Sequence, residues 1–232
     1  MELYLNKNLC KGFQIFAGFA IIQPMVISFL GKQFFKISQG NLTLAFNPIS
    51  KESKILDKGS RFGANIAIIT ANHPDYNGVE MVTHGDIIPL VIDGPGDYEV
   101  AGIFANGAGV STVLGGKSYI NTVYTLIASD IKICFLGALS KDLNSEVREA
   151  IGVPDILFVP IGGGDLLSPQ DAYKLAVSLE PSLIIPMDYN EASLKIFLKE
   201  AGGDKVAPVE KLTLKKKDLE GKQGEIVVLQ HA

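Results

Sequence analysis

Residues 66–77 read Ile66-Ala67-Ile68-Ile69-Thr70-Ala71-Asn72-His73-Pro74-Asp75-Tyr76-Asn77. The apolar start of this stretch predicts a buried strand, and the polar residues after it predict a loop at the strand's end. Residues two apart on an extended loop face the same side, so the loop presents His73 together with Asp75. Both residue types ligate metal ions, although a histidine beside a proline is also typical of an ordinary turn.

Five further blocks combine short apolar runs with glycine or polar residues, at 26–31, 94–100, 131–138, 156–164 and 184–189. Together with residues 66–77 they resemble the metallo-β-lactamase superfamily over nearly all of Met25 to Tyr189, and in particular its short, UlaG-like branch. The resemblance implies an α/β fold, the metallo-β-lactamase-like αββα four-layer sandwich of two mixed β-sheets flanked by helices. It also implies descent from metal-dependent hydrolases with metal ligands at strand ends.

Several ligands of that family are replaced in this sequence. In the family's H-x-H-x-D-H signature, Ala71 stands for the first histidine and Tyr76 for the last. Ala138 stands for an aspartate that bridges both metals, and Asp188 for the final histidine. His84 follows the first motif too closely to be assigned the role of the family's third histidine. A binuclear zinc centre is therefore not expected.

His73, Asp75 and Asp188 remain as ligand-type residues at the matched positions. One nitrogen and two carboxylates suit a single zinc or manganese ion, so the expected cofactor is either none or one such ion, with Asp75 as the catalytic residue. The alternative interpretation is that these three residues are polar side chains that line a former active-site cleft. Asn47 stands where many relatives have an aspartate, which exchanges a charged acceptor for a neutral amide.

These features predict a divergent hydrolase-like protein with a depleted metal site, capable of weak or single-metal hydrolysis at most. The alternative is a non-catalytic small-molecule-binding or scaffold protein on the same fold. A membrane-tethered protein that uses residues 13–30 is a third class. The small-molecule substrate or ligand is not identified by the sequence.

The composition indicates one soluble domain. The chain has 232 residues, 47% of them hydrophobic, and 21 Lys+Arg against 25 Asp+Glu, so no basic field favours nucleic acid. Residues 215–217 are three lysines, predicted as a solvated turn or strand edge. Cys10 and Cys134 form no disulfide pattern, which favours the cytoplasm, and Cys134 is predicted to be a buried structural thiol. A homo-oligomer is compatible with this composition.

Residues 1–24 are predicted to be an extension that precedes a domain at 25–232. Lys7 and Lys11 precede an apolar stretch at 13–22, in the order of a signal peptide or anchor. A spanning helix needs about 20 apolar residues, which this stretch reaches only by absorbing polar residues and the strand at 26–30. An upstream start codon would explain the extension; an added strand or anchor is the alternative. A membrane partner is not expected.

Periodicity predicts strands before helices. The expected strands are 26–30, 34–38, 42–46, 66–69, 98–105, 121–128, 131–135, 156–159 and 183–186. Ser140, Ser168 and Asn190 are the expected N-caps of three helices, the first running through Ala150. Glycines 162–164 lack the Lys-Ser/Thr ending of a phosphate-binding loop, so a strand-to-helix connection beside the cleft is favoured.

Overall fold

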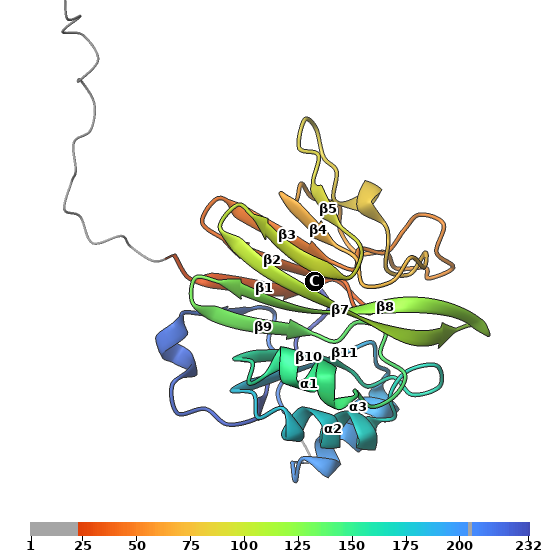
Figure 1. The fold of residues 1–232 in the computed structure, drawn as a ribbon, viewed down its shortest axis with the longest axis vertical. Coiled ribbons are helices and arrows are strands. Elements are labelled where there is room, and N and C mark those ends of the chain that lie inside the picture. The colour runs from red at the N-terminus through yellow and green to blue at the C-terminus, as the bar shows by residue number, and fades with distance from the viewer. Residues whose placement is uncertain (1–22, 204–205) are drawn as a thin grey trace, which may run out of the picture.

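The computed structural model describes residues 23–203 and 206–232, so the predicted extension falls almost entirely outside the described residues. Two β-sheets pack face to face (Figure 1). The strands of the first are β1 (Met25–Phe29), β2 (Phe35–Gln39), β3 (Leu42–Phe46), β4 (Ile66–Ile68), β5 (Leu90–Ile92) and β12 (Leu212–Leu214). Those of the second are β6 (Gly96–Val100), β7 (Ile103–Leu114), β8 (Lys117–Ala128), β9 (Ile131–Phe135), β10 (Ile156–Pro160), β11 (Leu183–Met187) and β13 (Glu225–Ile226).

Both sheets are mixed. The six-stranded sheet has the order β12-β1-β2-β3-β4-β5, in which β1, β2 and β3 form the predicted antiparallel meander and β3, β4 and β5 are parallel. The seven-stranded sheet has the order β13-β11-β10-β9-β8-β7-β6, in which β9, β10 and β11 are parallel. Because parallel neighbours end at the same edge of a sheet, the loops after β10 and β11 leave the seven-stranded sheet side by side.

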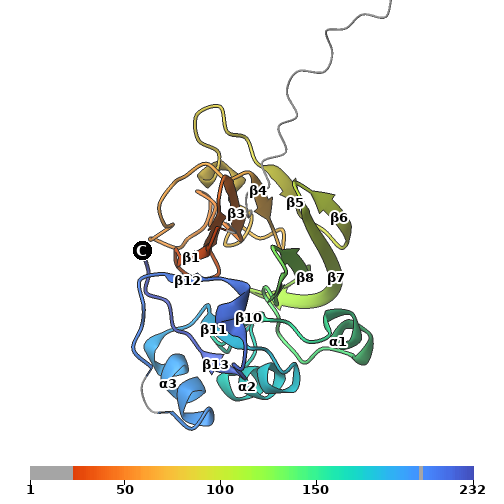
Figure 2. The same ribbon diagram turned by 90° about the vertical axis from the view of Figure 1, so that its left-hand side faces the viewer.

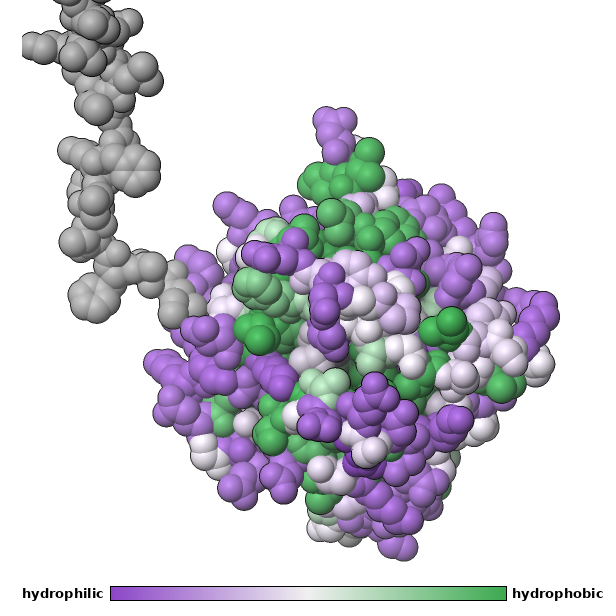
Figure 3. Space-filling view, viewed as in Figure 1, coloured by the Kyte–Doolittle hydropathy of each residue, from purple (hydrophilic) through white to green (hydrophobic). Residues whose placement is uncertain are grey.

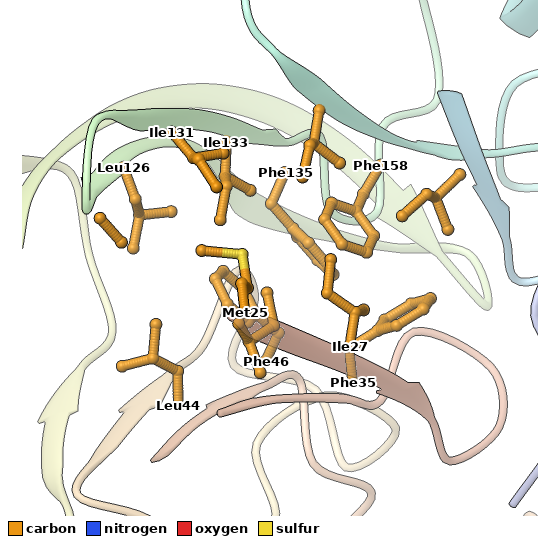
Figure 4. Packing of buried hydrophobic residues seen from close by; sticks show 14 of the residues in the cluster. Met25, Ile27, Phe35, Leu44, Phe46, Leu126, Ile131, Ile133, Phe135 and Phe158 are labelled. Atoms are coloured by element: carbon orange, nitrogen blue, oxygen red, sulfur yellow. The ribbon is translucent and has the colours of Figure 1, made fainter. Parts of the chain in front are cut away.

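Aromatic side chains from both sheets fill the space between them (Figure 4). The rings of Phe46 and Phe135 lie 4.7 Å apart between centroids, and those of Phe35 and Phe158 lie 4.8 Å apart. All four side chains are fully buried. Such ring pairs add about 0.5–1.5 kcal/mol each to the hydrophobic gain of burial, so this cluster anchors one sheet on the other.

The two outer faces are covered differently. Helices α1 (Ser145–Ile151), α2 (Pro169–Ser178) and α3 (Glu191–Glu200) lie on the seven-stranded sheet (Figure 2). The outer face of the six-stranded sheet is covered by the chain around the 3₁₀ helix η1 (Val79–Met81) and by loop residues such as Ile49 and Ala64. The predicted sandwich of two mixed sheets is confirmed, with irregular segments in place of one helical layer.

Two predicted elements are wrong. The strand expected at 98–105 is two strands, because Ala101 and Gly102 take φ angles of 51° and 77° and reverse the chain between β6 and β7. The first helix starts at residue 145 rather than near Ser140, because Asn144 is its N-cap and accepts a hydrogen bond from the Val147 N–H. The segment before it is irregular, and its leucines pack into the core.

Other local predictions are confirmed. Ser168 caps α2 and accepts from the Asp171 N–H, and Asn190 caps α3 in a reciprocal pair with Ser193. Cys134 is fully buried, and burial raises the pKa of its thiol to about 12. The lysines at 215–217 begin the short 3₁₀ helix η2 (Lys216–Leu219), where Lys216 and Lys217 are exposed, so the solvated turn is the confirmed alternative and the strand edge is not. Cys10 lies outside the described residues.

Exposed apolar side chains gather around the loop before β5, at the top of Figure 3. They include Ile87, Ile88, Leu90 and Val91, and β5 is an edge strand. An open apolar edge is a surface on which another chain can pair, so a homo-oligomer stays a prediction. In residues 23–203 and 206–232, none of the helices has the length and apolar character needed to cross a bilayer.

Candidate functional site

A cleft of about 530 Å³ lies where the loops after β4, β10 and β11 approach the β1–β2 and β7–β8 turns. Its walls hold polar and apolar side chains together with two of the three consecutive glycines. The lining residues are Lys32, His73, Asp75, Tyr76, Leu114, Gly115, Gly162, Gly163, Asp165, Leu166, Asp188, Tyr189 and Asn190. The fold therefore brings His73, Asp75 and Asp188 to the same cleft, while His84 is exposed and lies elsewhere.

Asp188 follows β11 directly in an unusual backbone conformation. Its φ angle is 53°, and its N–H donates to the carbonyl of Lys32 at 2.7 Å, a residue whose own φ is also 53°. A Cβ at Gly162 would clash with the carbonyl oxygen of Asp188. Left-handed conformations in residues with side chains are costly and concentrate at functional sites. The close approach of these three segments positions the Asp188 carboxylate at the cleft.

The carboxylate of Asp188 accepts from three side chains. Its Oδ2 atom accepts from the Gln33 amide at 2.9 Å and from the Tyr76 hydroxyl at 3.0 Å, and its Oδ1 atom lies 3.2 Å from the Lys32 ammonium. Gln33 and Tyr76 are buried. Burial, followed by the negative charge of Asp188, raises the pKa of Tyr76 far above its ordinary value. Tyr76 therefore stays protonated and acts as a donor.

Asp75 has a separate set of partners. The Ser53 hydroxyl donates to its Oδ1 atom at 2.6 Å, and the Lys32 ammonium lies 3.5 Å from its Oδ2 atom. The backbone N–H of Asp75 donates to Nδ1 of His73 at 3.2 Å. Since Nδ1 is an acceptor here, Nε2 is the nitrogen that carries the proton of a neutral His73 ring.

Behind the cleft, the amide of Asn47 joins the β1–β2 turn to the loop after β4. Its Nδ2 donates to Gln33 Oε1 at 3.0 Å and to Thr70 Oγ1 at 2.8 Å, while its Oδ1 accepts from the Thr70 N–H at 2.8 Å. A carboxylate at this position could not donate to Gln33, so the amide orients Gln33 toward Asp188. No buried side-chain nitrogen or oxygen in the described part of the chain lacks a hydrogen-bond partner.

The positions at which the family resemblance places lost ligands form an apolar cluster. Ala71, Tyr76 and Ala138 are buried there against Leu114 and Leu166. Neither alanine side chain has a ligand atom, and the Tyr76 hydroxyl already donates to Asp188. The interior of the site is thus closed by side-chain packing at these positions.

Sequence reasoning missed Lys32, Gln33 and Ser53. All three lie in segments that have the ordinary polar composition of turns, and only their long-range contacts reveal their role. Among residues 23–203 and 206–232, no group of three His, Cys, Asp or Glu side chains is arranged to hold a metal ion. Joint metal binding by His73, Asp75 and Asp188 stays a prediction.

The comparison with known proteins defines the family. The sequence model of the family described as beta-lactamase superfamily domain matches residues 26–188, and the chain belongs to this family. It is 25% identical over 198 residues to a UPF0173 metal-dependent hydrolase of Listeria welshimeri, covering 72% of this chain and 86% of that protein. The family resemblance expected from the sequence is confirmed.

Solved structures agree. A Thermotoga maritima protein described as a Zn-dependent hydrolase of the metallo-β-lactamase superfamily matches with a TM-score of 0.70 and 29% identity, covering 88% of this chain and 98% of that one. A Parabacteroides distasonis protein described as a metal-dependent hydrolase matches with a TM-score of 0.61 and 15% identity, covering 89% and 94%. The second likeness concerns the fold alone. The chain therefore has the architecture of proteins named as metal-dependent hydrolases.

Proposed function

We propose that this protein binds a small molecule in the cleft without a two-metal hydrolytic centre. The observation that carries the proposal is the apolar cluster at the matched ligand positions, where Ala71, Tyr76 and Ala138 pack against leucines. Two zinc ions need several nitrogen or oxygen ligands each, and the cluster supplies none. The protein is then a hydrolase-like family member with a depleted metal site.

The remaining carboxylates support the same conclusion. A zinc–oxygen bond is about 2.0–2.2 Å long and uses a free lone pair. Asp188 instead accepts from Gln33 and Tyr76 on one oxygen and faces Lys32 with the other. A metal ion would have to displace these donors, so the donor set does not fit a preformed binuclear site.

The charges of the cleft indicate which ligands fit. Asp75, Asp165 and Asp188 place three carboxylates in the lining against the single ammonium of Lys32. The phosphate-loop interpretation of the glycines is disfavoured, since a phosphate would meet excess negative charge. Leu114 adds an apolar wall. A neutral polar or cationic small molecule fits this lining better than an anion.

Weak hydrolysis with one metal ion is the second candidate. His73, Asp75 and Asp188 line the same cleft, and the Nδ1 atom of His73 lies 3.8 Å from Asp75 Oδ2. A single zinc or manganese ion held by these three residues would supply a metal-activated water, for which Asp75 would be the catalytic residue. This candidate requires the contacts between Lys32 and both carboxylates to open first.

A ligand screen with matched variants tests the proposal. Gly163 and Gly164 both have positive φ angles and open space beyond the Cα atom, but only Gly163 lines the cleft. Gly163→Gln therefore fills the cleft, and Gly164→Gln carries a similar backbone strain outside it. Neutral, cationic and anionic metabolites are screened by thermal shift against both variants.

The proposal expects neutral or cationic compounds that stabilise the wild type and Gly164→Gln but not Gly163→Gln. The same proteins are assayed with ester, lactone and phosphodiester substrates, with and without Zn²⁺ or Mn²⁺. Metal-stimulated turnover that His73→Ala abolishes would refute the proposal and establish the second candidate.

A further inference from the structure

We propose that the ammonium group of Lys32 is a built-in cation that takes the place of a metal ion between Asp75 and Asp188. This inference deepens the proposed function and rests on it, because it explains how the cleft keeps two carboxylates without a metal centre. Its consequence is specific: removal of the Lys32 charge should turn a site that excludes divalent cations into one that binds them.

The geometry of the three groups carries the inference. Lys32 Nζ lies 3.5 Å from Asp75 Oδ2 and 3.2 Å from Asp188 Oδ1. The two carboxylates come from loops that follow strands of different sheets, yet one cation bridges them. These two distances are those of an ammonium ion pair and are about 1.0–1.5 Å longer than zinc–oxygen bonds. The distances from the two carboxylates thus suit the lysine ammonium.

Lys32 is also held in place, unlike a lysine that samples solvent. Its side chain is only 22% exposed, and its ammonium lies 5.3 Å from the centre of the Tyr76 ring. Its backbone carbonyl accepts from the Asp188 N–H, which ties the β1–β2 turn to the end of β11. Charge, ring and backbone contacts all direct this one side chain to the same two carboxylates.

The remaining partners explain why Asp188 tolerates the exchange of a metal for an ammonium. Gln33 and Tyr76 donate to the oxygen that Lys32 does not approach most closely. The pair therefore has the further hydrogen bonds that a partly buried ion pair needs. Asp75 is completed in the same way by the hydroxyl of Ser53. Without Lys32, the two negative charges would face one another unneutralised.

Calorimetric titration of Mn²⁺ and Zn²⁺ into four proteins tests the inference. They are the wild type, Lys32→Met, Lys32→Arg and Lys36→Met. Lys36→Met is the matched control, because Lys36 lies on the adjacent strand over the Phe62 ring and contacts neither carboxylate. Lys32→Arg keeps the positive charge. Circular dichroism with and without Mn²⁺ monitors folding in parallel.

Lys32→Met is expected to bind Mn²⁺ at least about tenfold more tightly than the other three proteins, and adding Asp188→Asn to it should remove the gain. If Lys32→Met is unfolded in metal-free buffer, Mn²⁺ should restore its folded spectrum. Equal metal affinity in all four proteins, or a spectrum that Mn²⁺ does not restore, overturns the inference. A wild type that already binds two metal ions tightly refutes the proposed function instead, so the two failures are distinguishable.

Discussion

Replacing Asp188 by alanine should destabilise the protein strongly although the residue lies at a cleft. The change removes the acceptor of the Gln33 amide, the Tyr76 hydroxyl and the Lys32 ammonium at once. Asp165→Ala is the matched control, because Asp165 also lines the cleft but is exposed and, among the residues that the structure describes, accepts only from the Gly115 N–H.

The magnitude follows from the burial of each partner. Gln33 and Tyr76 are buried, so each unsatisfied donor costs about 1–3 kcal/mol. Lys32 is 22% exposed and its ammonium can be hydrated by water, so the loss of its ion pair with Asp188 adds less than about 1 kcal/mol. The sum is about 2–7 kcal/mol, a large part of the roughly 5–15 kcal/mol that stabilises a domain. The control should cost less than about 1 kcal/mol.

Urea unfolding followed by circular dichroism measures both variants, with thermal melting as a second readout. A destabilisation of about 2–7 kcal/mol corresponds to a fall in Tm of about 4–28 °C for a domain of this size. An Asp188→Ala protein as stable as Asp165→Ala would show that the hydrogen bonds to Asp188 do not hold the site together.

Three further predictions concern buried groups. Burial raises the pKa of Tyr76, so the contribution of its protonated hydroxyl to stability is present below the unfolded pKa of about 10 and is lost as pH rises above it. In alkaline thermal melts, the Tm of Tyr76→Phe should therefore fall less steeply with pH than the Tm of the wild type, and equal slopes would contradict this. Burial raises the pKa of Cys134 to about 12, so a thiol reagent at about pH 8 should label this residue only after the protein unfolds. The labelling is done in a Cys10→Ser background, and rapid labelling of the folded protein would count against the burial of Cys134. An added Cβ at Gly137 would clash with buried side-chain atoms, so Gly137→Ala should lower the free energy of unfolding in urea by more than about 2 kcal/mol. The control Gly116→Ala places its Cβ in open space and should cost about 1 kcal/mol, so equal costs would refute the clash.

The fold was accessible from the sequence because its signals are local. The apolar run at 66–69 and the polar loop after it predicted a buried strand that ends at the cleft, and the strand is present as β4. Proline at the first turn and an acidic third residue predicted α2 from Ser168. These patterns reflect burial and capping, which depend on neighbouring residues.

The site was only partly accessible, because its decisive contacts are not local. Asp75 and Asp188 carry a recognisable motif context, whereas Lys32 follows a glycine and looks like a turn residue. Its partner Asp188 is 156 residues away in the chain. Ser140 was a plausible helix cap by type, but the leucines on either side of it, Leu139 and Leu143, pack into the core, and Asn144 caps the helix instead. Tertiary packing decided both cases.

The ionic triad of Lys32, Asp75 and Asp188 also makes the two functional candidates separable. A single metal ion can bind only if Lys32 withdraws, so metal affinity and the Lys32 contacts oppose one another. Substitution of Asp75 should weaken any residual metal binding, because it removes one of the three ligand-type side chains that share the cleft. Binding of a small molecule does not require Lys32 to leave the two carboxylates.

Metal content of the natively purified protein tests the central claim most directly. Elemental analysis is performed on protein purified without chelators, before and after dialysis against Zn²⁺ and then metal-free buffer. The account predicts well below about one metal ion per chain in both samples, because Ala71 and Ala138 supply no ligands and Lys32 occupies the carboxylates. A stoichiometry near two zinc ions per chain would contradict it.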